Sequence, residues 1–105
     1  MSVDSHIVTM TDRIVRAFDP VRIVLFGSHG RGEAGRDSDV DLLVVLPRVD
    51  DQRRAAIAIR RLLADLPVAK DIVVTTPEEI AARGHLVGTI LRPALREGTV
   101  VYERE

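Results

Sequence analysis

The sequence of 105 residues contains no cysteine. Disulfide bonds, cysteine-ligated zinc sites and thiol nucleophiles are therefore excluded. The same absence makes an intracellular protein the default, and we expect a cytoplasmic location. The length fits one domain spanning residues 1–105, with a modest core and no room for a separate substrate domain.

Aromatic side chains are scarce, with one tyrosine, two phenylalanines and no tryptophan. They are too few to form a platform on which bases stack. The 15 basic and 16 acidic residues nearly balance, so the sequence lacks the positive charge of a general nucleic-acid binder. No apolar run approaches the ~20 residues that span a bilayer, and the N-terminus lacks a signal-peptide pattern. We expect neither a membrane nor a nucleic acid as direct partner.

Hydrophobic periodicity predicts helices and strands that alternate along the chain. Helices are expected to start at Asp4 or Ser5, at Asp50 or Asp51, and at Thr76, where the run TPEE forms a capping box. A further helical segment, interrupted by Pro93, is expected at 85–97. Strands are expected at 21–26, 41–46, 71–75 and 99–102. The fold class is therefore α/β (α+β), with a mixed sheet of about four strands flanked by helices.

Two aspartates stand one residue apart where the second predicted strand begins, in the run SDVDLLVV. Successive side chains of a strand alternate faces, so Asp39 and Asp41 should project from the same side, with Cα atoms roughly 6.6 to 7 Å apart. Asp71 offers a third carboxylate at the start of another strand. Carboxylate oxygens without nearby histidine or cysteine suit Mg²⁺ or Mn²⁺. We therefore predict a metal site formed by Asp39, Asp41 and Asp71.

A glycine-rich segment separates the first two predicted strands. At Gly27 and Ser28 the backbone N–H groups can approach an anion closely, and the serine hydroxyl adds a donor. Arg31, and less strongly Arg36, could neutralise phosphate charge. A phosphate-binding turn next to a metal site predicts a nucleoside triphosphate as ligand.

Each of these features also has a simpler interpretation. The glycines could belong to an ordinary loop, the aspartates could be solvated acids at strand ends, and Arg31 could be a surface residue. Ser28 could cap a short helix. Four arginines of the helix that starts near residue 51 are expected to form a solvated face, with acidic partners as the alternative: Arg53, Arg54, Arg60 and Arg61.

Gly27-Ser28, ten residues, then Asp39-Val40-Asp41 resembles the GS-x10-DxD signature of nucleotidyltransferases similar to DNA polymerase beta. The run LFGSHGRG, the later KDIVV and the ending ILRPALREGTVVYERE resemble the minimal nucleotidyltransferase (MNT) family. That family is the antitoxin half of HEPN/MNT toxin–antitoxin pairs. The sequence departs from many relatives at His29-Gly30, which shifts the expected basic contact onto Arg31.

The resemblance implies a polymerase beta-like nucleotidyltransferase fold that binds Mg²⁺ or Mn²⁺ and uses ATP as substrate. Asp39 and Asp41 would hold the metal–triphosphate, and Asp71 would complete the metal site and help deprotonate the acceptor hydroxyl. The implied activity is transfer of AMP to a tyrosine of a cognate HEPN ribonuclease toxin, which silences the toxin.

Two other functions remain open on the sequence. The chain could be a non-catalytic antitoxin that neutralises its toxin by forming a complex. It could also modify a small molecule, although such enzymes usually need an added helical domain to hold the acceptor.

Overall fold

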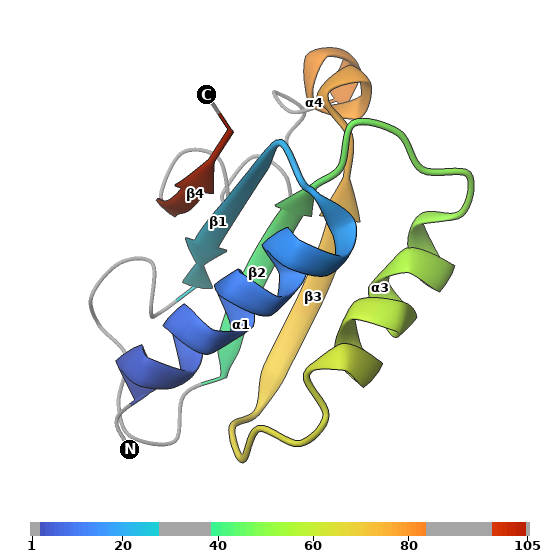
Figure 1. The fold of residues 1–105 in the computed structure, drawn as a ribbon. Coiled ribbons are helices and arrows are strands. Elements are labelled where there is room, and N and C mark those ends of the chain that lie inside the picture. The colour runs from blue at the N-terminus through green and yellow to red at the C-terminus, as the bar shows by residue number, and fades with distance from the viewer. Residues whose placement is uncertain (1–2, 28–38, 84–97, 105) are drawn as a thin grey trace.

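A computed structural model describes residues 3–27, 39–83 and 98–104 (Figure 1). The described elements, in chain order, are α1 (Val3–Phe18), β1 (Arg22–Phe26), β2 (Val40–Val45), α3 (Gln52–Leu62), β3 (Lys70–Thr75), α4 (Pro77–Arg83) and β4 (Thr99–Glu103). They include every strand predicted from the sequence. The helical segment predicted at 85–97 and most of the glycine-rich segment lie outside the described residues.

The strands form one four-stranded mixed sheet in the order β3-β2-β1-β4. β2 runs parallel to β3, while β1 is antiparallel to both β2 and β4. The parallel pair requires a crossover connection, and α3 supplies it. The predicted α+β class with a mixed sheet flanked by helices is therefore confirmed.

The central strands divide their side chains between two apolar clusters. Leu42 and Val44 of β2 lie in the cluster that includes Ile14 of α1 and Ile59 of α3. In Figure 1, α1 and α3 cover the near face of the sheet. The alternate residues of β1 and β2 form the second cluster, on the opposite face: Val24, Phe26, Leu43 and Val45. Because both faces are buried, the residues of β2 after Asp41 form a continuous apolar run.

Two of the three predicted helix starts are confirmed by their caps. The Arg54 backbone N–H donates to Asp51 Oδ1 over 3.0 Å at the start of α3. The Glu79 N–H donates to Thr76 Oγ1 over 3.1 Å at the start of α4. The first helix starts earlier than predicted, at Val3 rather than at Asp4 or Ser5. Residues that cap a helix are also tolerated in its first turn, where N–H groups lack intrahelical partners, so the sequence does not separate the two positions.

None of the helices in the described ranges combines the length and the apolar character that a bilayer crossing requires.

Candidate active site

Gly27 ends β1 in a conformation that favours glycine, with φ of +69°. A Cβ built at this position would overlap Oδ2 of Asp41 and lie 3.2 Å from its Cγ. The backbone of Gly27 therefore lies directly against the Asp41 carboxylate. Sequence reasoning predicted a close backbone approach at this glycine, and the described group it approaches is one of the predicted acids.

Asp41 and Asp71 are brought together by the parallel pairing of β2 with β3. The two residues are register partners, so they sit side by side on neighbouring strands about 4.8 Å apart. Asp41 is also the register partner of Phe26, the residue before Gly27. The end of β1 and the starts of β2 and β3 therefore lie together at the same end of the sheet.

Asp39 lies immediately before β2 and is exposed, while Asp41 and Asp71 are half-buried. The Val40 N–H donates to Ala69 O over 2.9 Å, which fixes the chain between the two aspartates to the start of β3. Alternation would place the Asp39 side chain on the Asp41 side of the strand. That shared side remains a prediction from the sequence.

Asp71 forms an ion pair that the sequence did not predict. Arg60 Nη2 of α3 lies 2.7 Å from Asp71 Oδ1. Arg60 was expected on a solvated face because its helical position points away from the apolar stripe. The signal available in the sequence was topological: a helix that connects two parallel strands ends near the start of the second strand.

The sequence profile of the nucleotidyltransferase domain family matches residues 9–96. The chain belongs to this family. No curated protein sequence matches it significantly. Two solved structures share its fold at sequence identities below 25%, which limits the comparison to the fold.

The first is a protein from Sulfolobus solfataricus assigned provisionally as a nucleotidyltransferase. It shares 17% identity with a TM-score of 0.65, over 97% of this chain and 86% of the other. The second is a toxin–antitoxin solved with AMP-PNP. It shares 19% identity with a TM-score of 0.54, over 92% of this chain and 73% of the other.

Part of the predicted nucleotide site lies outside the described residues. Ser28, Arg31 and Arg36 belong to the segment 28–38, so their roles in this nucleotidyltransferase domain stay predictions. Gly27, Asp39, Asp41 and Asp71 are described, and three of them come together through the strand register and the Gly27 contact.

The chemistry of these residues fits the metal that the nucleotidyltransferase family implies. The donors are carboxylate oxygens, which suit Mg²⁺ or Mn²⁺. A Cβ at Gly27 would overlap Asp41 Oδ2, so the glycine allows this carboxylate to lie against the backbone. In the part of the chain that the structure describes, no three acidic or histidine side chains are already gathered as a metal-binding cluster. The assignment of Asp39, Asp41 and Asp71 as metal ligands therefore remains a prediction.

A cavity of about 790 Å³ lies at the opposite end of the parallel strands, where β2 and β3 end. Its lining carries charges of both signs, from Arg48, Arg53, Asp50, Asp51 and Glu78. It contains none of the acids predicted for catalysis. The contact between Gly27 and Asp41, and not the size of a cavity, therefore locates our candidate site in this nucleotidyltransferase domain.

Proposed function

We propose that this chain is a metal-dependent nucleotidyltransferase that acts as an antitoxin, transferring AMP from ATP to a tyrosine hydroxyl of a HEPN ribonuclease toxin. The observation that carries the proposal is the contact of Gly27 with Asp41 beside Asp71, in a chain that belongs to the nucleotidyltransferase domain family. The antitoxin role is supported by the fold shared with a toxin–antitoxin. The HEPN toxin and its tyrosine come from the MNT resemblance of the sequence.

The reaction joins the tyrosine oxygen to the α-phosphorus of ATP. The bond between that phosphorus and the oxygen bridging to the β-phosphate breaks, and pyrophosphate leaves with the bonding electrons. The tyrosine proton passes to a base, for which Asp71 is the candidate. Most of the catalysis would come from positioning and from neutralising charge on the transferred phosphoryl group.

Each described residue has a distinct task in this proposal. Gly27 allows the Asp41 carboxylate to lie against the turn that ends β1, where the triphosphate would bind. Asp39 and Asp41 would hold the divalent metal, with Asp71 as third ligand and base. When bound, Mg²⁺ supplies positive charge that offsets the negative charge of the triphosphate.

The proposal predicts that Asp39→Asn/Asp41→Asn abolishes transfer and leaves the fold intact. Asp39 and Asp41 stand one residue apart, and Asp41 lies beside Asp71, so their like charges repel and removing two of them should not destabilise the metal-free protein. The test is intact-mass spectrometry of the candidate toxin after incubation with ATP and Mg²⁺. Asp12→Asn/Asp50→Asn is the matched control, because it removes the same charge at two other positions.

We expect the toxin to gain the mass of one or more AMP units with the wild-type and control proteins, and none with Asp39→Asn/Asp41→Asn. If the wild-type protein forms a complex with the toxin, but the toxin gains no mass with any nucleoside triphosphate, the proposed enzymatic activity is contradicted. That result would instead support a non-catalytic antitoxin that neutralises its toxin by complex formation. Unfolding of the double aspartate variant would indicate a structural role for these residues.

A further inference from the structure

Arg60 connects the face of α3 to the candidate active site. Its guanidinium Nη2 lies 2.7 Å from Asp71 Oδ1, and both side chains remain about half exposed to solvent. Asp71 belongs to β3, the edge strand of the sheet, and α3 packs against β3. The arginine can therefore reach the acid past the open edge of the sheet, and solvent can reach both groups.

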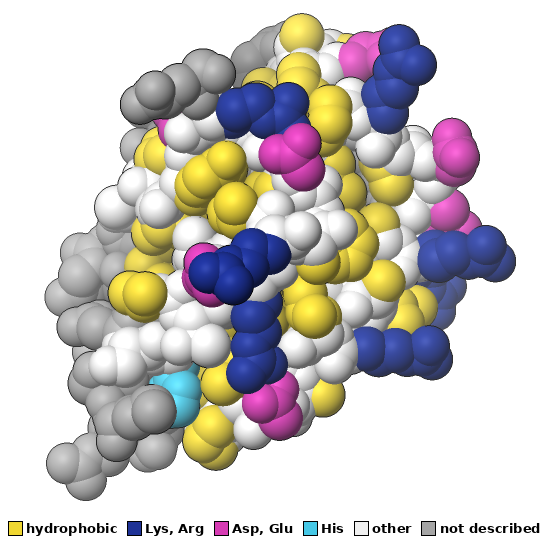
Figure 2. Space-filling view, viewed as in Figure 1, with side chains coloured by type: hydrophobic (Ala, Val, Ile, Leu, Met, Phe, Trp, Pro, Cys, Tyr) yellow, Lys and Arg dark blue, Asp and Glu magenta, His cyan; other side chains and the backbone are white. Residues whose placement is uncertain are grey.

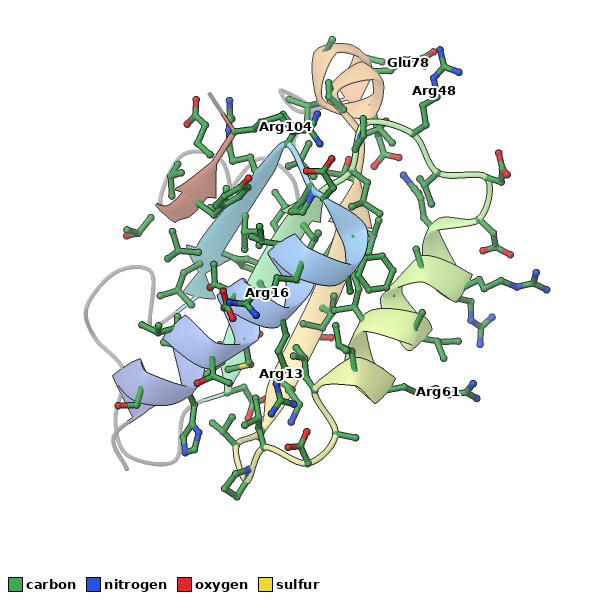
Figure 3. All side chains as sticks on the ribbon, viewed as in Figure 1. Arg13, Arg16, Arg48, Arg61, Glu78 and Arg104 are labelled. Atoms are coloured by element: carbon green, nitrogen blue, oxygen red, sulfur yellow. The ribbon has the colours of Figure 1, made fainter. Side chains whose placement is uncertain are left out.

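The other arginines of α3 do not share this arrangement. Within the described residues, Arg53, Arg54 and Arg61 are exposed and form no ion pair. Figure 3 shows Arg61, next to Arg60 in sequence, pointing away from the sheet. On the face drawn in Figure 2, basic side chains are interspersed with acidic ones. The placement of Arg60 at Asp71 is specific.

The position next to Asp71 creates a conflict with metal binding. Asp41 and Asp71 are register partners, so their like charges repel when the site holds no cation. The guanidinium offsets that repulsion, and it occupies the Oδ1 atom that could otherwise bind a metal. A divalent ion that binds Asp71 must compete with the positive charge of Arg60 a few ångströms away.

We propose that Arg60 is a positioning residue that acts as the resident counter-cation of Asp71 and competes with the divalent metal for that carboxylate. The inference rests on the proposed function, since it assumes that a metal binds here. Before the substrate arrives, the positive charge of Arg60 offsets the negative charge of the carboxylates at the starts of β2 and β3. Arg60 would leave Asp71 when the divalent ion of the metal–triphosphate, with two positive charges, binds the acids.

The test measures metal affinity directly, by titrating the whole protein with Mn²⁺ and following free Mn²⁺ by electron paramagnetic resonance. We expect Arg60→Gln to tighten Mn²⁺ binding about three- to tenfold, because a unit charge about 6 Å from a dication costs about this much in affinity, even in water. Arg61→Gln is the matched control, with the same charge change on the neighbouring residue, and should shift binding less than about twofold.

A second comparison isolates the Asp71 contact. In an Asp71→Asn background, Arg60→Gln should tighten Mn²⁺ binding much less, because the carboxylate that holds Arg60 at the site, and for which the two cations compete, is gone. Mn²⁺ binding by wild type, and its loss in Asp41→Asn, would support the metal site. If Arg60→Gln then binds Mn²⁺ no more tightly than wild type, this inference alone is overturned. Absence of saturable Mn²⁺ binding in the wild type, with or without ATP, would overturn the inference and the proposed metal site together.

Discussion

Gly27 combines two requirements that no other residue type meets together. Its positive φ is a conformation that side chains with a Cβ rarely adopt, and its Cα lies against the Asp41 carboxylate. The first requirement concerns the turn that ends β1. The second concerns the site, because any side chain at Gly27 must displace Asp41. The position of Asp41, a candidate metal ligand, therefore depends on the absence of a side chain at residue 27.

We predict that Gly27→Ala destabilises the protein by about 1 to 3 kcal/mol, from the strained φ together with the overlap at Asp41. Urea denaturation gives the free energy of unfolding. In an Asp41→Ala background the overlap is absent, so the same substitution should cost measurably less. Equal costs in the two backgrounds would show that only the backbone conformation matters and that Gly27 does not shape the site.

Glu79, in α4, forms hydrogen bonds with α3 and β3 at the end of the sheet away from the candidate site. Its carboxylate accepts hydrogen bonds from Thr75 Oγ1 of β3, over 3.1 Å, and from Gln52 Nε2 of α3. Its backbone N–H donates to Thr76 at the start of α4. The capping box predicted from the sequence is therefore half confirmed, because Thr76 caps the helix while the Glu79 side chain binds neighbouring elements.

Removing this carboxylate should loosen the junction between α3, β3 and α4. Thr75 is fully buried, so Glu79→Ala leaves its hydroxyl without this acceptor, at a cost of about 1 to 3 kcal/mol in the free energy of unfolding. Glu78→Ala, at the exposed neighbouring position, should change stability by less than about 0.5 kcal/mol. Similar losses in the two variants would mean that helix propensity, and not the Glu79 contacts, determines stability here.

Arg13 of α1 forms an ion pair with Asp65, in the turn that follows α3, and we predict that this pair makes stability depend on pH. Arg13 Nη2 lies 3.1 Å from Asp65 Oδ2, and its Nη1 donates to Leu62 O over 3.2 Å. Figure 3 shows Arg13 on the side of α1 that faces the end of α3. The hydrogen bond from Arg13 is the main cause that lowers the pKa of the Asp65 carboxyl below its ordinary value.

A lowered pKa in the folded state means that the Asp65 contribution to stability is complete above the unfolded value of about 3.9 and is lost as the pH falls through the folded value. Wild type should therefore have a higher Tm than Asp65→Asn near pH 7. The difference should shrink below about pH 4. Thermal unfolding of both proteins between pH 7 and pH 2.5 tests this. A difference that stays constant through pH 3 would mean that the pair does not contribute through its charge.

At the scale of the whole molecule, the strands and helices among the described residues were largely predictable, because their apolar periodicity matches the faces they bury. Residues 42–45 of β2 are apolar, and β2 proved to be a central strand, as expected for a strand covered on both faces. Helix ends were less well determined. The first helix began before Asp4, since polar residues suit both a cap and a first turn.

Sequence reasoning selected the acids and the glycine of the candidate site, whose roles stay predictions, but it did not find the ion pair. Gly27, Asp39 and Asp41 stand within one short stretch, so their spacing carried the signal. The Arg60–Asp71 pair depends on how the crossover through α3 returns to the edge of the sheet. The Glu79 contacts with Gln52 and Thr75 likewise depend on the approach of three elements. No local sequence pattern predicts the Arg60–Asp71 pair or the Glu79 contacts, because both join residues from different elements.

The central claim is that Gly27 and the acids of β2 and β3 form a metal–triphosphate site. The most direct test is calorimetric titration of the protein with ATP, with and without Mg²⁺, for wild type and Asp41→Asn. We predict ATP binding that requires Mg²⁺ and weakens at least about tenfold in Asp41→Asn, because one metal ligand is lost. Equal ATP affinity in the two proteins, or ATP affinity that is the same with and without Mg²⁺, would contradict the claim.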